Sequence, residues 1–245
     1  MLVSKSMSKN VITIDVDDSM QEAVKLMKQR DIRMLPVLKK GKLVGVVTDR
    51  DLKRASASDA TTLDVHELLY LVSKIEVGNI MTKDPITVPQ NFTVEETAVV
   101  LLKNKISGAP VADQNGQLVG TITQTDLFRV LVSFTGVGKG GIQFAFQLED
   151  RPGSIKEVAD VIRLYGGRMV SILTSYEDVP DGYRKVFIRM HSIERVRLQQ
   201  LKEELSCKAA LIYMEDHREN IREIFLPAGK FASSRAVHGM VVASN

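Results

Sequence analysis

The stretch LVGVVTDRDL, Leu43–Leu52, has a second copy in the chain, LVGTITQTDL at Leu118–Leu127. Both copies contain Leu-Val-Gly, then Thr three positions after the Gly, two variable residues and Asp-Leu. This pattern predicts a short buried strand that runs into a helix, with the Thr at the junction and the Asp three positions later. We interpret each copy as half of a small-molecule site.

The duplication extends beyond this stretch. Residues 7–52 align with residues 81–127, at a spacing of 74 that becomes 75 after the turns KKGK and DQNGQ. In each copy a short strand, at 11–16 or 86–88, precedes a capping box, SMQE or TVEE, that should begin a helix. Two strands around a Gly-containing turn and a second helix follow. Each unit is therefore predicted to be β-α-β-β-α, and the two units should share a core because one alone is marginal.

Two linking segments flank the second repeat. Between the repeats, Val65, Leu68, Leu69 and Val72 have helical spacing, which predicts a short amphipathic helix. This helix is either a connector packed on its own domain or a contact with a second copy. After the second repeat, the glycines of TGVGKGG (135–141) indicate a hinge. The segment lacks the GK[ST] ending of a phosphate loop.

A different order of elements is predicted after residue 141. A strand at 142–148 is followed by the turn DRPG and by a capping box, Ser154 to Glu157, that opens a helix ended by Gly166-Gly167. Strands at 169–176 and 183–190, a helix from Ser192 and a strand at 209–214 complete a βαββαβ, ferredoxin-like sandwich. The tail has little periodicity, so we expect partial disorder, with swapping onto a partner as the alternative.

Composition argues against several functional classes. Lys and Arg number 33 and Asp and Glu 30, so the net charge is +3, unlike that of a dedicated nucleic-acid binder. The single cysteine, Cys207, can form no internal disulfide, which fits a reducing compartment. No apolar run approaches the roughly 20 residues of a membrane helix, and the first residues lack a signal-peptide core. We therefore expect a cytoplasmic protein with no membrane or nucleic-acid partner.

Catalytic patterns are equally weak. The four histidines are scattered, His66-Glu67 lacks the second histidine of a zinc-helix motif, and there is no G-x-S-x-G elbow or dense carboxylate cluster. We expect neither an enzyme nor a metal site.

The two repeats resemble cystathionine-β-synthase (CBS) domains, and the pair resembles a Bateman module. The βαββαβ unit with its DRPG turn looks like an ACT domain. The order CBS–CBS–ACT, with the linker SASDATTLDVHELLYLVSKIEV, is similar to the AcuB-type proteins of acetoin utilisation. The expected fold class is α+β, with these parts: CBS domains at 1–55 and 78–134, a helical connector at 56–77, a Gly-rich hinge at 135–141, an ACT domain at 142–215 and a C-terminal tail at 216–245.

This resemblance implies a regulatory binder of adenine nucleotides (AMP, ADP or ATP) or S-adenosylmethionine, with Mg²⁺ as a companion of the nucleotide. In the family motif Gly-h-h-Thr-x-x-Asp, the Thr contacts phosphate and the Asp holds the ribose hydroxyls, while the first strand and the h-Pro-Val segment line the adenine. The implied nucleotide-binding residues are Thr13, Ile14, Arg33, Leu35, Pro36, Thr48, Arg50, Asp51, Thr87, Val88, Ala109, Pro110, Thr123 and Asp126.

The ACT resemblance implies an amino-acid ligand, often bound across a dimer. CBS and ACT units both associate with further copies in family members, so the resemblance also implies a homodimer. The implied contact residues are Asp150, Gly153, Ser154 and Met169. Two alternatives stay open here: the DRPG segment can be only a turn capped by Ser154, and ACT domains also serve purely as dimerisation units.

The chemistry of the duplicated corner supports both a ligand role and a structural one. A helix N-terminus offers unpaired N–H groups to phosphate, but Thr-x-x-Asp is itself a capping arrangement. Arg33 and Arg50 could neutralise phosphate in the first half, where the second half has Ser107 and Thr125. We therefore predict that the first half favours the more anionic ligand. A ligand-free dimerisation scaffold, and a regulatory subunit of an acetoin- or purine-metabolism enzyme, are the alternative functions.

Overall fold

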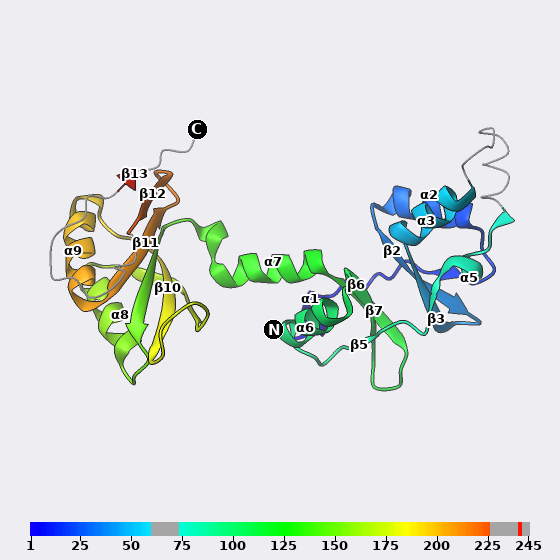
Figure 1. Ribbon diagram of the computed structural model, residues 1–245, viewed down its shortest axis with the longest axis horizontal. Coiled ribbons are helices and arrows are strands. Elements are labelled where there is room, and N and C mark those ends of the chain that lie inside the picture. Colours follow the sequence, from blue (N-terminus) through cyan, green and yellow to red (C-terminus); the bar gives the residue numbers. More distant parts are fainter. Residues whose placement is uncertain (60–73, 226–239, 242–245) are drawn as a thin grey trace. The chain divides into compact units, whose positions relative to one another are not determined.

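The computed structural model describes residues 1–59, 74–225 and 240–241 of the 245-residue chain (Figure 1). The chain folds as two compact units, Met1–Val130 and Leu131–Asn245. The first unit contains both sequence repeats, and the second contains the βαββαβ segment. The amphipathic helix expected around Val65–Val72 lies outside the described residues.

The first repeat folds in the predicted β-α-β-β-α order. Its elements are β1 Ile14–Asp15, α2 Met20–Arg30, β2 Met34–Lys39, β3 Lys42–Thr48 and α3 Asp49–Asp59. β1 pairs in parallel with β2, and β2 pairs antiparallel with β3. α2 begins after Ser19, whose Oγ accepts a hydrogen bond from the Glu22 N–H at 3.2 Å. β1 is shorter than the predicted strand at 11–16, and it ends at Asp15 because the chain turns there: the Asp15 N–H donates to Asp18 Oδ2 at 2.9 Å.

The second repeat has the same order. Its elements are β5 Val88–Pro89, α6 Val94–Asn104, β6 Gly108–Ala112, β7 Leu118–Thr123 and α7 Gln124–Thr135. The predicted capping box at α6 is complete: the Glu96 N–H donates to Thr93 Oγ1 at 3.1 Å, and the Thr93 N–H donates to Glu96 Oε2 at 2.7 Å. Each repeat packs its helices on its sheet around its own core, so the expectation of one shared core is wrong.

The first segment of each repeat packs on the other repeat. The short helices are α1 Val3–Ser6 and α5 Val77–Ile80, and α5 leads into strand β4 Thr82–Lys83. Val3 is fully buried in the core of the second repeat, and Val77 is fully buried in that of the first. β4 extends the first sheet by pairing with β3. The predicted boundaries divide the chain by sequence repeat, whereas the packing exchanges these two segments.

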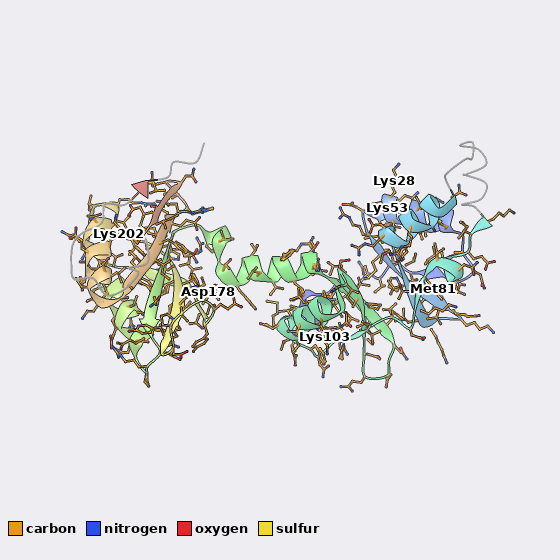
Figure 2. All side chains as sticks on the ribbon, in the orientation of Figure 1. Lys28, Lys53, Met81, Lys103, Asp178 and Lys202 are labelled. Carbon is orange, nitrogen blue, oxygen red and sulfur yellow. The ribbon has the colours of Figure 1, made fainter. Side chains whose placement is uncertain are left out.

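This exchange explains the Gly of the duplicated stretch. A Cβ on Gly45 would clash with the Met81 sulfur, and a Cβ on Gly120 would clash with the Met7 sulfur. Figure 2 labels Met81, which belongs to the second sequence repeat and packs against the core of the first. The Gly therefore makes room for the segment that arrives from the other copy.

Val3→Ala is expected to destabilise the second repeat by about 1–3 kcal/mol, because it leaves a cavity in a fully buried site. Hydrogen exchange should accelerate more in β6 and β7 than in β2 and β3, and Val77→Ala should give the reverse pattern. Leu2→Ala is the control, since Leu2 is 45% exposed. Identical exchange patterns in the two valine variants would contradict the exchange of segments.

The second unit contains the predicted βαββαβ order and adds two strands. Its elements are η1 Val137–Lys139, β8 Ile142–Glu149, α8 Ser154–Leu164, β9 Arg168–Ser175, β10 Tyr183–His191, η2 Arg195–Arg197, α9 Leu198–Lys208, β11 Ala210–Asp216, β12 Ile221–Ile224 and β13 Met240–Val241. The sheet order is β13-β12-β11-β8-β10-β9. α8 and α9 pack over the core of this sheet, around Phe144, Phe146 and Leu201 (Figure 1).

Three local predictions in this unit need correction. Ser154 does not cap α8: the N-cap is Gly153, and the Ser154 hydroxyl instead donates to the Arg151 carbonyl at 3.1 Å. Ser192 does not begin a helix, because its φ of 68° is left-handed, whereas an N-cap residue is typically extended. α9 begins at Leu198, after η2. In the tail, β12 pairs antiparallel with β11, so Ile221–Ile224 is part of the sheet.

The Gly-rich segment is held against the second unit. The Thr135 carbonyl accepts hydrogen bonds from Ser171 Oγ at 2.8 Å and from Arg189 Nε at 3.1 Å. Gly141 has a φ of 87°, and a Cβ there would clash with the Met190 carbonyl oxygen. The glycines therefore permit close packing on β9 and β10.

Candidate functional site

The duplicated stretch forms a hydrogen-bonded corner where β3 ends and α3 begins. Asp51 Oδ2 accepts from the Thr48 N–H at 2.9 Å and from the Thr48 hydroxyl at 2.6 Å. Thr48 Oγ1 also lies 3.4 Å from the Asp51 N–H, from which it accepts. Both residues are half-buried. The Thr hydroxyl and the Asp carboxylate are thus held together at the positive end of a helix.

The second repeat builds the same corner between β7 and α7. Asp126 Oδ2 accepts from the Thr123 N–H at 2.9 Å and from the Thr123 hydroxyl at 2.7 Å, and the Asp126 N–H lies 3.4 Å from Thr123 Oγ1. The sequence repeat is therefore a repeat of side-chain geometry as well.

Strand direction brings the other predicted residues of each repeat to this corner. β1 and β2 are parallel and β3 is antiparallel to β2, so the amino ends of β1 and β2 lie at the same edge as the carboxyl end of β3. Thr13 precedes β1 and is half-buried. The Asp49 N–H donates to the Arg33 carbonyl at 3.1 Å, which places Arg33 beside the start of α3. In the second repeat the Gln124 N–H donates to the Ser107 carbonyl at 2.9 Å in the same way.

The predicted adenine-lining residues are mostly part of the two cores. The apolar ones are almost fully buried, and their side chains pack inside their own repeats: Ile14, Leu35, Val88 and Ala109. Pro36 and Pro110 are also buried, whereas Thr87 is exposed. The buried apolar residues therefore support the sheet edge at each corner through core packing.

The two corners differ in charge. Arg33 and Arg50 have exposed side chains near the first corner, and their counterparts Ser107 and Thr125 are exposed near the second. The first corner therefore has two exposed arginines that the second lacks, and it also has Asp49 where the second has Gln124. This arrangement is consistent with the predicted preference of the first half for the more anionic ligand, which stays a prediction.

Arg129 adds a difference that the sequence reasoning missed. Arg129 Nη1 donates to Asp126 Oδ1 at 2.8 Å, so both oxygens of this carboxylate have protein partners. The counterpart of Arg129 is Arg54, which is exposed and makes no ion pair with Asp51 within the part of the chain that the structure describes. Nothing in the sequence signals this difference, because Arg54 and Arg129 both follow the Asp of their corner at the i,i+3 spacing of helical ion pairs.

In the second unit, Arg184 contacts two of the residues that are predicted to bind an amino acid. Arg184 Nη1 lies 3.4 Å from Asp150 Oδ1, and Arg184 Nη2 donates to Ser154 Oγ at 3.2 Å. Gly153, with a φ of 89°, forms the turn between them. Met169 is half-buried and packs against the core of this unit. Sequence reasoning missed Arg184, because a charged residue at the start of a strand is ordinarily a surface residue.

A second arginine, Arg151, forms hydrogen bonds that stabilise the same turn. Arg151 makes two hydrogen bonds to Glu157, at 2.8 and 2.9 Å, and these bonds lower the pKa of the Glu157 carboxyl. Arg151 also bonds Glu149 at 3.0 Å. The DRPG turn is therefore a structured, internally paired loop.

Among residues 1–59, 74–225 and 240–241, no group of three His, Cys, Asp or Glu side chains is placed to hold a metal ion. In the same ranges no helix has the length and apolar character needed to cross a bilayer.

Comparison with known proteins identifies relatives of the first unit. The CBS domain family model matches residues 3–58 and 77–133. A CBS domain-containing protein of Dictyostelium discoideum is 33% identical over 132 residues, which cover 54% of this chain and 91% of that protein. Inosine-5'-monophosphate dehydrogenase of Korarchaeum cryptofilum is 37% identical over 120 residues, which cover 49% of this chain but 22% of that enzyme.

A solved structure covers the same region. It is a CBS domain pair in complex with 5'-methylthioadenosine and S-adenosyl-L-methionine, 32% identical to this chain. The match covers 54% of this chain and 95% of that chain, with a TM-score of 0.46.

Proposed function

Because this chain belongs to the CBS domain family, we propose that its repeat pair binds an adenine nucleotide or S-adenosylmethionine and acts as a non-catalytic regulatory sensor. The observation that carries this proposal is the duplicated corner, in which the same three hydrogen bonds join a Thr and an Asp at a helix N-terminus. The helix N–H groups and the Thr hydroxyl suit phosphate, and the carboxylate suits a ribose diol. Mg²⁺ would enter with the phosphates of ATP.

Helix capping accounts for part of this geometry. The first corner also has a hydrogen-bond acceptor that the cap does not use. Asp51 uses Oδ2 for the cap, and its Oδ1 has no hydrogen-bond partner within the described part of the chain. A carboxylate oxygen with free lone pairs next to two exposed arginines is suited to a phosphorylated ribose. The first half is therefore the site we propose for the more anionic ligand.

Thermal denaturation with AMP, ATP and S-adenosylmethionine tests this proposal. A ligand at 100 times its Kd should add about 2.7 kcal/mol to the free energy of unfolding of the state that binds it. We expect the first unit to melt at a higher temperature with at least one of the three. An unchanged melting temperature with saturating amounts of all three would exclude the sensor.

A ligand-free scaffold is the second candidate. It is favoured by Asp126, whose two carboxylate oxygens are both satisfied by protein groups. For this candidate, native mass spectrometry of the purified protein would find a dimer without bound nucleotide and none after incubation with AMP or ATP.

For the second unit we propose an ACT-type assignment, with an amino-acid ligand at the Asp150–Ser154 turn and a homodimeric protein. The βαββαβ order and the guanidinium of Arg184 at the turn support it. The same proposal includes membership of the AcuB-type proteins and a cytoplasmic location. It also includes a role in regulating an enzyme of acetoin or purine metabolism. Co-purification of one fixed enzyme with the tagged chain would support the regulatory-subunit version.

A further inference from the structure

The two Asp carboxylates of the duplicated corners differ in how many hydrogen bonds they accept. Asp51 accepts two, both from Thr48 and both on Oδ2. Asp126 accepts the same two from Thr123 on Oδ2 and a third on Oδ1, from Arg129 Nη1 at 2.8 Å. A carboxylate has about four acceptor positions, roughly two on each oxygen. Among the described residues, Asp51 therefore keeps both positions of Oδ1 open, whereas Asp126 keeps only one.

Burial separates the two members of the Asp126–Arg129 pair. Asp126 is 6% exposed, whereas 73% of the Arg129 side chain is exposed. The guanidinium thus lies at the surface, over a carboxylate that is otherwise buried. A guanidinium has five N–H donors in a planar fork, and the hydrogen bond to Asp126 uses one of them. Arg129 is therefore able to bond an anionic group that arrives from solvent.

Helical spacing alone does not produce this pair. Arg54 follows Asp51 at the same i,i+3 spacing, yet within the part of the chain that the structure describes it makes no ion pair with Asp51. The pair is thus a property of the second corner. The other polar side chains named at that corner are uncharged: Ser107, Gln124 and Thr125. Arg129 is therefore the positive side chain of this set.

The open acceptor positions limit how each corner holds a sugar. A ribose diol has two hydroxyls to donate, and at Asp51 both find an open position on Oδ1. At Asp126 the second hydroxyl competes with Arg129 for Oδ1. A ligand that carries a phosphate gives the displaced guanidinium a new partner through charge-assisted hydrogen bonds. A ligand without phosphate breaks the ion pair and leaves the guanidinium with solvent alone.

We propose that Arg129 determines which ligand the second corner accepts, by favouring a phosphorylated adenosyl ligand such as a nucleoside monophosphate over an unphosphorylated one. This inference rests on the proposed function, because it takes the Thr123–Asp126 corner to be a nucleotide site. It also gives the satisfied oxygens of Asp126 a role other than that of a closed scaffold. Oδ1 is held by a side chain that the ligand itself displaces.

The test compares AMP with adenosine, which share the base and the diol and differ in the phosphate. Asp51→Ala protein is used, so that the second corner is the site measured by isothermal titration. AMP should bind more tightly than adenosine. Adding Arg129→Met should lower the ratio of the adenosine Kd to the AMP Kd at least about tenfold, as expected when a hydrogen-bonded charge pair is lost. Arg129→Lys keeps a positive charge for phosphate and should hold the ratio within about threefold of the parent.

Arg54 provides the matched control in the first repeat. In Asp126→Ala protein, where the first corner is measured, Arg54→Met should leave the adenosine Kd within about twofold, because Arg54 does not occupy Asp51. Arg129→Met should instead tighten adenosine binding at the second corner, since it frees Oδ1. Adenosine binding also reports the fold, because a variant that still binds adenosine retains the corner. Arg129→Gln replaces Arg129→Met if the latter unfolds.

An adenosine-to-AMP ratio that stays within about twofold after Arg129→Met overturns this inference, and so does loss of all AMP binding in Asp51→Ala protein. Both results leave the sensor intact if wild-type protein binds AMP or ATP at the first corner. Wild-type protein that binds neither nucleotide overturns the proposed function and this inference together. A fall of the ratio with Arg129→Met, its recovery with Arg129→Lys and no change in the Arg54 control support the assignment.

Discussion

Asp51→Ala is expected to weaken ATP binding by at least about tenfold, the cost of losing one or two hydrogen bonds to a charged group. Asp51 is the carboxylate with an oxygen not occupied by the described protein groups, and Arg33 and Arg50 lie at the same corner. Asp126→Ala should change ATP affinity by less than about twofold and weaken AMP more strongly. Isothermal titration of both variants with both nucleotides measures this asymmetry.

The control for this experiment must separate binding from capping, because Asp51 also closes the start of α3. Ser19→Ala removes a cap of the same repeat at the start of α2, and it should cost about 1 kcal/mol of stability without changing nucleotide affinity. Asp51→Asn keeps a cap acceptor but removes the charge. Equal losses for ATP and AMP in both Asp→Ala variants would remove the proposed difference between the two halves.

Gly141→Ala is expected to destabilise the second unit by roughly 2–4 kcal/mol, because a Cβ at a left-handed position would also clash with a backbone carbonyl. The φ of Gly141 is 87°, and the obstructing group is the Met190 carbonyl oxygen, which cannot move without disturbing β10. Chemical denaturation followed through the second unit measures the loss.

Gly138 is the matched control in the same segment. A Cβ at Gly138 has no atom within 4 Å, and its φ is not left-handed. Gly138→Ala should therefore be neutral or stabilise by up to about 1 kcal/mol, since it reduces the freedom of the unfolded chain. Neutral results at both positions would mean that residues 135–141 are a free linker, as their composition suggests.

Much of the fold could be predicted from the residues alone, and the reason is the short range of the signals. The capping box at Thr93–Glu96 and the corner at Thr48–Asp51 both join residues three positions apart. A single copy of the Thr-Asp corner would have been ambiguous. The second copy at Thr123–Asp126 made the pattern recognisable as a repeat. The failures at Ser154 and Ser192 arose where a suitable cap residue adopted another backbone conformation or bonded another group.

The residue types of the candidate site could be predicted from the sequence, but the distant residues that bond to them could not. Arg184 reaches Ser154 across 30 positions of the chain, and Arg189 reaches the Thr135 carbonyl across 54. No local pattern indicates such a contact, because it depends on which strands become neighbours.

By itself the sequence determined the two β-α-β-β-α repeats, the βαββαβ order after them and the Thr-Asp pair at each corner. These features depend on side-chain periodicity and on hydrogen bonds that span a few residues. Only the tertiary structure decided that Val3 is buried in the second repeat and Val77 in the first. It also decided that Gly141 packs on Met190, and which apolar side chains remain outside the cores. These contacts depend on burial against residues far away in the chain. The sequence of one strand or helix does not indicate which distant residues will pack against it.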